Sequence, residues 1–224
     1  MLPVAKDARV TAIDDTGVQV GAERIDVGTA AVIMPWNEPL RVAEKAALLD
    51  NVAQGRFRFG VGRGLSRREY VPFRGVEMDE SRGRFDEGTA MVIEALRTGY
   101  IEGDGPYFPQ PRTEIRPRPE RSFDDRFYCV ASSDDSVESA ARFAGRMTMF
   151  ADRAWEHRMP SIETYRKRFK ELHGREAPPV MTADFCLCAP TAEEAEEKAR
   201  QYMGARKSTR LNSSHITISY AVFC

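Results

Sequence analysis

The sequence predicts an α/β protein built from parallel β-α units, and a (β/α) barrel accommodates these units best. Short apolar, β-branched runs alternate with amphipathic runs, which is the order that parallel βαβ units produce. Neither a GxGxxG nor a GxxxxGK[ST] phosphate loop is present, so a Rossmann or P-loop fold has no motif to support it. The length of 224 residues suits one domain with a substantial core.

Each element follows from its local pattern. The first predicted strand, residues 24–34, is dominated by small and β-branched side chains and carries charge only at Arg24 and Asp26. The helix at residues 79–99 has apolar side chains at helical spacing, although Gly83 and Gly88 weaken it. The five predicted strands are residues 24–34, 56–62, 126–131, 146–150 and 178–189, and the predicted helices are residues 40–54, 79–99, 134–145, 161–174 and 191–203.

Three segments depart from this alternation. Residues 1–23 form an atypical N-terminal segment whose pattern favours a hairpin turning at Asp15–Gly17. Residues 99–125 are rich in Gly, Pro and Asp and predict a long loop that is either functional or disordered, and we expect substrate specificity to lie there. Residues 206–224 begin with RKSTRLNSSH, which resembles a translated sequencing adapter, so we leave them out of the fold prediction. The barrel domain is therefore expected at residues 24–205.

Composition excludes several classes of protein. Lys and Arg number 33 against 34 for Asp and Glu, so no overall basic field favours nucleic acid or an anionic membrane. No apolar run reaches the roughly 20 residues that a membrane span needs, and MLPVAKDARV does not read as a secretory signal. The cysteines form no CxxC pair, which argues against a disulfide framework or a zinc site and for the reducing cytoplasm; they are Cys129, Cys186, Cys188 and Cys224.

Five features occur together between residues 28 and 65. They are GTAA, a Pro-x-x-x-Pro loop, RxAE, LLD and GRFRFGxxRGL. With these features, the sequence from about Glu23 to Gly204 resembles the luciferase-like family of flavin-dependent monooxygenases. The resemblance implies a (β/α)8 TIM barrel, here incomplete because about five strands are recognisable.

The resemblance also implies an activity and its partners. It predicts a bacterial oxidoreductase that receives reduced FMN from a separate flavin reductase and uses O2 to oxidise a small organic substrate. Two alternatives stay open: an F420-dependent oxidoreductase of the same fold, and a non-catalytic subunit or inactive fragment. A dimer is expected by analogy, with the helix Leu40–Gln54 as its candidate face because Val42/Ala46/Leu49 and Ala43/Ala47 form two apolar stripes.

Five residues match cofactor-binding positions of the family. Ala30 and Ala31 fall where the family has a non-prolyl cis peptide bond, although GTAAV is also consistent with a small-residue strand that fills the barrel. Arg63 matches an arginine that contacts the FMN phosphate, for which a guanidinium fork is well suited. Ser133 and Ser136 match a serine and a threonine that contact the same phosphate, at a predicted helix N-terminus.

Ordinary structural roles are open for the same residues. Arg63 could form a surface ion pair with Glu69 or with an aspartate, and Ser133 could simply cap its helix. The neighbouring Asp134 and Asp135 would disfavour a phosphate unless they point away.

The catalytic residue is not recognisable in this sequence. The family's histidine stands in a Glu-His pair after the second strand, and no such pair precedes Ala30; Gly62 stands where luciferase has a reactive cysteine. His157 and His173 lie far downstream: His173 is interpreted as a helix-end residue, and His157 as a partly exposed structural residue that could also reach the mouth of the barrel. Because a closed barrel typically needs about 250 residues, we expect this chain to be poorly soluble or inactive on its own.

Overall fold

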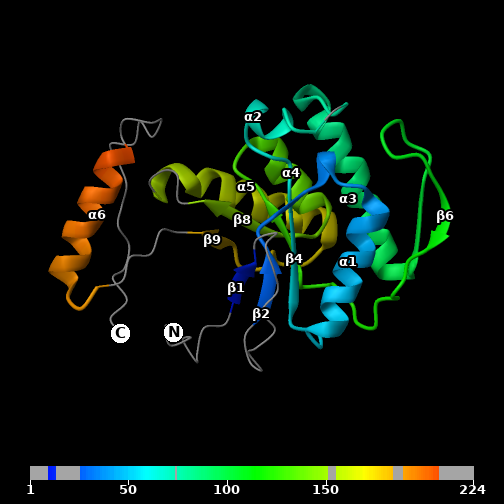
Figure 1. The fold of residues 1–224 in the computed structure, drawn as a ribbon, viewed down its shortest axis with the longest axis horizontal. Helices are drawn as coiled ribbons and strands as arrows, with labels where there is room; N and C mark the ends of the chain where they lie inside the picture. The colour runs from blue at the N-terminus through cyan, green and yellow to red at the C-terminus, as the bar shows by residue number, and fades with distance from the viewer. Residues whose placement is uncertain (1–9, 14–25, 74, 151–154, 184–188, 207–224) are drawn as a thin grey trace.

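The computed structural model describes residues 10–13, 26–73, 75–150, 155–183 and 189–206. Its centre is a curled parallel sheet, half of a barrel, with the strand order β1-β2-β4-β7-β8-β9 and with β3 beside β4 (Figure 1). The predicted barrel class is thereby confirmed. The strands of this sheet are β1 (Val10–Ile13), β2 (Asp26–Thr29), β3 (Val32–Ile33), β4 (Phe57–Gly62), β7 (Phe127–Val130), β8 (Arg146–Phe150) and β9 (Met181–Ala183).

Helices follow most of the strands and cover the outer face of the sheet. Helix α1 packs on α3 and β4, whereas α4 packs on α5, β7 and β8. Two 3₁₀ turns, η1 (Met34–Trp36) and η2 (Met78–Glu80), precede α1 and α3. The helices are α1 (Pro39–Val52), α2 (Arg67–Tyr70), α3 (Ser81–Thr98), α4 (Asp134–Arg142), α5 (Trp155–His173) and α6 (Ala192–Arg206).

The two faces of the sheet differ in chemistry. Paired residues such as Val61 and Cys129 lie on the same face, so alternate positions along each strand point outward. The outward positions form the core with the helices and include Phe57, Phe59, Val61, Phe127, Cys129, Met147 and Met149. The inward positions are small or polar and include Gly28, Arg58, Gly60, Tyr128 and Arg146.

Most predicted elements are present, with shifted ends. The predicted strand 24–34 is two strands, β2 and β3, separated by a bend at Ala30–Ala31. The predicted helix 161–174 begins six residues earlier, at Trp155. Residues 10–13 form β1, which pairs in parallel with β2. The predicted turn at Asp15–Gly17, Cys186, Cys188 and the segment 207–224 lie outside the described residues.

The two apolar stripes of α1 are both used inside the molecule. Val42, Ala43, Ala46 and Ala47 are all buried in the core of this chain. The expectation that one stripe is left over for a dimer is therefore wrong, because the helix is wedged between β4 and α3 and needs both.

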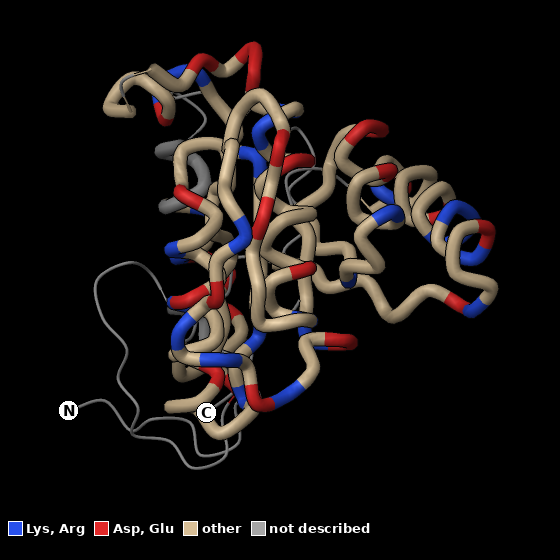
Figure 2. Tube along the Cα trace, turned by 90° about the vertical axis from the view of Figure 1, so that its right-hand side faces the viewer, with Lys and Arg blue, Asp and Glu red and all other residues tan. Residues whose placement is uncertain are grey.

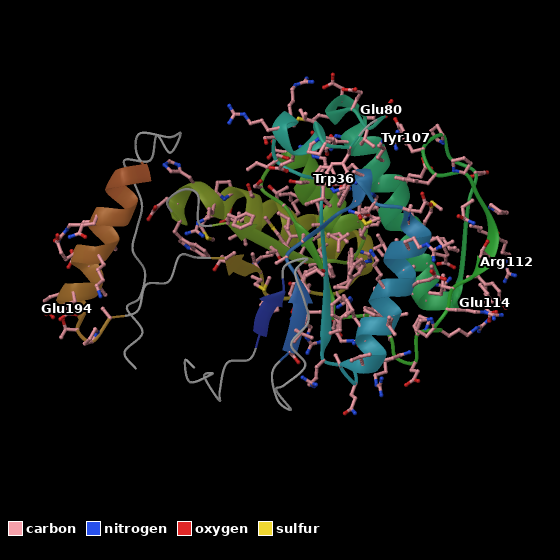
Figure 3. The ribbon with its side chains drawn as sticks, in the orientation of Figure 1. Trp36, Glu80, Tyr107, Arg112, Glu114 and Glu194 are labelled. Atoms are coloured by element: carbon pink, nitrogen blue, oxygen red, sulfur yellow. The ribbon has the colours of Figure 1, made fainter. Side chains whose placement is uncertain are left out.

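The segment 99–125 contains regular structure, which corrects the prediction of a long loop. Strands β5 (Tyr100–Gly103) and β6 (Gln110–Glu114) form an antiparallel hairpin against α3. The Glu87 carboxylate accepts hydrogen bonds from the backbone N–H groups of Tyr107 (3.2 Å) and Phe108 (2.6 Å). The Arg84 guanidinium lies 5.2 Å from the centre of the ring of Tyr107, which is labelled in Figure 3. The hairpin is thus held by its tip on the first half of α3.

Gly83 makes room for this contact, and its replacement tests the docking. A β-carbon at position 83 would lie 2.5 Å from the Tyr107 ring. Glycine to alanine in a helix interior usually stabilises by about 1 kcal/mol, but here we expect Gly83→Ala to destabilise by roughly 1–2 kcal/mol because the ring must move. Urea unfolding measures the change. With Tyr107→Ala already present, the same substitution should stabilise; a stabilising effect in both backgrounds would contradict the docking.

Candidate functional site

The carboxyl ends of β4 and β7 meet at one edge of the sheet. The register pairs Val61 with Cys129, so Arg63 and Ser133 follow neighbouring parallel strands at the same edge. In barrels this edge is where active sites form. The bend of β2–β3 lies beside it, since a β-carbon at Gly62 would lie 3.4 Å from the Ala31 β-carbon. The structure therefore brings the predicted site segments to one edge of the sheet.

The peptide bond between Ala30 and Ala31 is cis, as the family resemblance implies. The bend is fixed against β4 because the Thr29 hydroxyl lies 2.9 Å from both the N–H and the carbonyl oxygen of Gly60. A β-carbon at position 60 would lie 2.1 Å from the Thr29 carbonyl oxygen, so only glycine permits this approach. The result is a surface of small residues next to the carboxyl end of β4.

Arg63 has no carboxylate partner among the residues that the structure describes. Its Nη1 lies 3.5 Å from the Ser81 hydroxyl, at the start of α3. Glu69, the partner considered from sequence, instead accepts hydrogen bonds from the Leu65 N–H (2.8 Å) and the Ser66 hydroxyl (3.4 Å). The Arg63–Glu69 ion pair is therefore not formed, and the guanidinium keeps donors for another group.

Ser133 is the N-cap residue that precedes α4, Ser136 lies in the first turn of the helix, and the two residues form a capping box. The Ser136 hydroxyl lies 2.9 Å from the Ser133 N–H, 3.0 Å from the Ser132 N–H and 3.0 Å from the Ser133 hydroxyl. The capping role considered from sequence is thus present. The hydroxyls also stand at the positive end of the helix dipole, where an anion is favoured.

Arg82 is a member of this edge that the sequence analysis missed. Its Nη2 lies 2.5 Å from a carboxylate oxygen of Asp135, two residues beyond Ser133. This pairing counters the negative charge that would disfavour a phosphate there. A usable signal exists in the sequence: a helix that follows a barrel strand begins at the carboxyl edge, so the starts of the helices after neighbouring strands are expected at the same edge.

Aromatic side chains close one side of this edge. Trp36, which is labelled in Figure 3, stacks on Phe73 with ring centres 4.6 Å apart and contacts Tyr70 edge-on at 4.8 Å. Tyr70 is buried, and its hydroxyl donates a hydrogen bond to the Arg63 carbonyl. Burial raises the pKa of the Tyr70 hydroxyl, against a smaller opposing effect of a hydrogen bond from Ser81. Tyr70 therefore remains a neutral hydrogen-bond donor at physiological pH.

Other chemically active side chains lie away from this edge. His173 contacts the Ala141 carbonyl at 2.7 Å and packs on Phe169, so it joins α5 to α4. Burial raises the pKa of the Cys129 thiol to about 12, which keeps it protonated. Trp155 is exposed, and its ring lies 5.0 Å from the Arg158 guanidinium. Within the described ranges, no cluster of three or more His, Cys, Asp or Glu side chains is placed to hold a metal ion.

A family model for luciferase-like monooxygenases matches residues 18–218 of the sequence. The chain belongs to the luciferase-like monooxygenase family. Among curated relatives, the alkanal monooxygenase alpha chain of Photorhabdus laumondii is 27% identical over 199 residues, which are 87% of this chain and 54% of the relative. The chain thus spans about half the length of the curated relatives that it matches.

Solved structures agree with this membership. The monooxygenase RslO1 of Streptomyces bottropensis is 26% identical with a TM-score of 0.67, over 84% of this chain and 56% of that one. The F420-dependent tetrahydromethanopterin reductase of Methanopyrus kandleri (TM-score 0.67, 18% identity, 83% and 57% covered) shares the fold. So does the FMN-bound oxygenating constituent of 3,6-diketocamphane monooxygenase from Pseudomonas putida (0.63, 13%, 85% and 56%).

The surface of this luciferase-like chain carries both signs of charge. Figure 2 shows basic and acidic residues interspersed along the chain rather than gathered in one region. None of the described helices combines the length and the apolar character that a bilayer crossing requires.

Proposed function

We propose that this luciferase-like chain binds reduced FMN at the carboxyl edge of β4 and β7 and serves the O2-dependent oxidation of a small organic substrate. The observation that carries the proposal is Arg63, a guanidinium without a described carboxylate partner, beside the N-terminus of α4. Membership in a monooxygenase family supplies the reaction class. A separate reductase would deliver the reduced cofactor in the cytoplasm.

The residues present fit a phosphate monoester next to a flat ring. Arg63 offers parallel N–H donors, and Ser133 and Ser136 add hydroxyls at the positive end of a helix. Ala30, Ala31 and Gly62 offer a backbone surface with few side-chain atoms, which a planar ring can approach closely. Phosphate and ring would thus be held by different segments of the same sheet edge.

Each segment would have its own task in the reaction. The cofactor, when bound, supplies the electrons that activate O2. Arg63 and the first turn of α4 would anchor its phosphate, and the bend at Ala30–Ala31 would set the position of the ring. The Trp36–Phe73 pair would shield that edge from water, which protects reactive oxygen chemistry. The catalytic acid or base is not identified among the described residues.

F420 is the second candidate cofactor. Two structures of the same fold are described as F420-dependent, a reductase and a secondary alcohol dehydrogenase. A deazaflavin also carries a phosphate group, so Arg63 and α4 would suit it equally. A non-catalytic subunit is a third candidate, because the beta chain of alkanal monooxygenase from Photorhabdus luminescens is 26% identical over 186 residues.

Association with a second chain is part of the proposal. Alpha and beta chains both occur among the relatives. The outer face of α1 is the candidate surface, since Leu48 and Val52 are each 51% exposed, one helical turn apart.

A binding titration tests the cofactor. The purified chain is titrated with FMN, riboflavin and F420, with binding followed by fluorescence. We expect FMN to bind at least tenfold more tightly than riboflavin, because a charge-assisted contact to phosphate contributes about 1.5–3 kcal/mol. Tighter binding of F420 than of FMN would favour the deazaflavin alternative. Equal affinity for FMN and riboflavin would contradict a phosphate site at this edge.

A further inference from the structure

We infer that Tyr70 and Ser81 are positioning residues for Arg63: they fix its backbone and its guanidinium so that the remaining N–H groups face the cofactor phosphate. The inference rests on the proposed function and adds two residues that neither the sequence motifs nor the family match singled out. It follows from the geometry of the turn between β4 and α2.

The turn after Arg63 is closed by bonds that return to its start. Gly64 has a φ of +87°, which reverses the chain where a residue with a side chain would be strained. The Glu69 carboxylate accepts the Leu65 N–H at 2.8 Å, and the Tyr70 hydroxyl donates to the Arg63 carbonyl. Two successive residues of α2 thus form hydrogen bonds to the first residues of the turn and restrain the backbone of Arg63.

Tyr70 is itself held on several sides. It is 4% exposed and meets Trp36 at 4.8 Å with the rings nearly perpendicular. A β-carbon at Gly64 would lie 3.2 Å from the Tyr70 ring, so the turn packs closely on its other side. A ring confined in this way keeps its hydroxyl in place, and the hydrogen bond from this hydroxyl holds the Arg63 carbonyl.

Ser81 orients the other end of Arg63 without neutralising it. The Ser81 side chain is almost completely buried, and in the described part of the chain its hydroxyl is the hydrogen-bond partner of the guanidinium. The serine hydroxyl carries no charge and accepts a hydrogen bond from only one of the five N–H groups of the arginine. A carboxylate at position 81 would instead pair with Arg63 and compete with an anion.

The neighbouring residue in α3 supports this arrangement. Arg82 pairs with Asp135 at 2.5 Å, which ties the first turn of α3 to the first turn of α4. The first turn of α3, where Ser81 lies, is therefore in contact with the first turn of α4, which begins next to Ser133. A shift of Ser81 would move the guanidinium relative to the serine hydroxyls, and phosphate affinity would fall while affinity for the ring would stay the same.

The ratio of riboflavin to FMN dissociation constants isolates this effect, since the two ligands differ only in the phosphate. Measured on the full chain, Tyr70→Phe and Ser81→Ala should each lower the ratio roughly threefold to tenfold, the range for one hydrogen bond, with riboflavin affinity unchanged. Ser81→Thr keeps the hydroxyl and should retain the ratio. Ser81→Asp should abolish the preference for FMN.

Tyr165→Phe is the matched control. The buried Tyr165 hydroxyl also donates to a backbone carbonyl, that of Gly145 at 2.8 Å, but between α5 and the start of β8. Tyr165→Phe should lower thermal stability about as much as Tyr70→Phe does, and it should leave the ratio of riboflavin to FMN dissociation constants unchanged. If Tyr70→Phe does not fold, the positioning role is tested by comparing the ratio in Ser81→Ala with the ratio in Ser81→Thr.

The outcomes separate the two proposals. A wild-type chain without preference for FMN would contradict the proposed function, and the positioning roles would fall with it. A wild-type preference that survives in both Tyr70→Phe and Ser81→Ala would overturn the positioning roles alone. If Tyr165→Phe lowers the ratio of dissociation constants as much as Tyr70→Phe does, the positioning roles are also overturned, because the effect would then reflect lower stability.

Discussion

Replacing Asp50 with alanine is expected to lower the free energy of unfolding by about 3–5 kcal/mol, the range for removal of one partner from a buried ion pair. Asp50 is fully buried on α1 and pairs with Arg126, which precedes β7. Loss of the carboxylate would leave a guanidinium in the core with no opposite charge. Urea unfolding followed by circular dichroism measures the change.

The contacts of Arg126 explain the size of this effect. Beyond Asp50, its guanidinium donates to the carbonyl oxygens of Gly55 (3.1 Å), Phe57 (3.3 Å) and Ser122 (3.0 Å from Nε). The group thus joins α1, the start of β4 and the segment before β7. It lies at the end of the strands opposite to Arg63, where barrel residues contribute to stability rather than to activity.

Two comparisons make the prediction specific. Asp79→Ala removes an exposed partner of Arg67 (2.9 Å) and should change stability by less than about 1 kcal/mol. The double variant Asp50→Leu/Arg126→Met removes both buried charges and should recover most of the loss. A double variant as unstable as Asp50→Ala would show that packing, not the unpaired charge, determines the effect.

Local pattern was enough for the central β-α units and too weak for the hairpin. The strands at 57–62 and 146–150 and the helix at 39–52 are marked by apolar side chains at a regular spacing, which a single sequence displays. The hairpin at 100–114 has no such regular spacing. It is held instead by tertiary contacts from Glu87 and Arg84 of α3, which its own sequence does not display. Gly83 weakened the helix prediction, but its missing side chain leaves the space that the Tyr107 ring needs beside α3.

The candidate site shows the same division between local and tertiary information. Arg63, Ser133 and Ser136 could be proposed from the sequence because they follow strand ends in segments that resemble the family. Tyr70 and Ser81 could not, since a hydroxyl 7 or 18 residues from Arg63 reaches it only through the turn and the start of α3. The aspartate of the LLD motif is Asp50, which forms the buried ion pair with Arg126.

Replacing Arg63 with alanine is expected to weaken FMN binding by about 1.5–3 kcal/mol, roughly tenfold to 150-fold, with riboflavin binding unchanged. The charge-assisted bond to the phosphate would be lost, while the surface at Ala31 and Gly62 would remain for the ring. Arg63→Lys should fall between wild type and alanine, because an ammonium keeps the charge without the planar fork. Arg67→Ala is the control: it removes the same charge a few residues away, from an exposed pair with Asp79, and should leave the FMN affinity within about twofold. An unchanged FMN affinity in Arg63→Ala by fluorescence titration, or an equal loss of affinity for riboflavin, would contradict a phosphate site at this edge of the sheet.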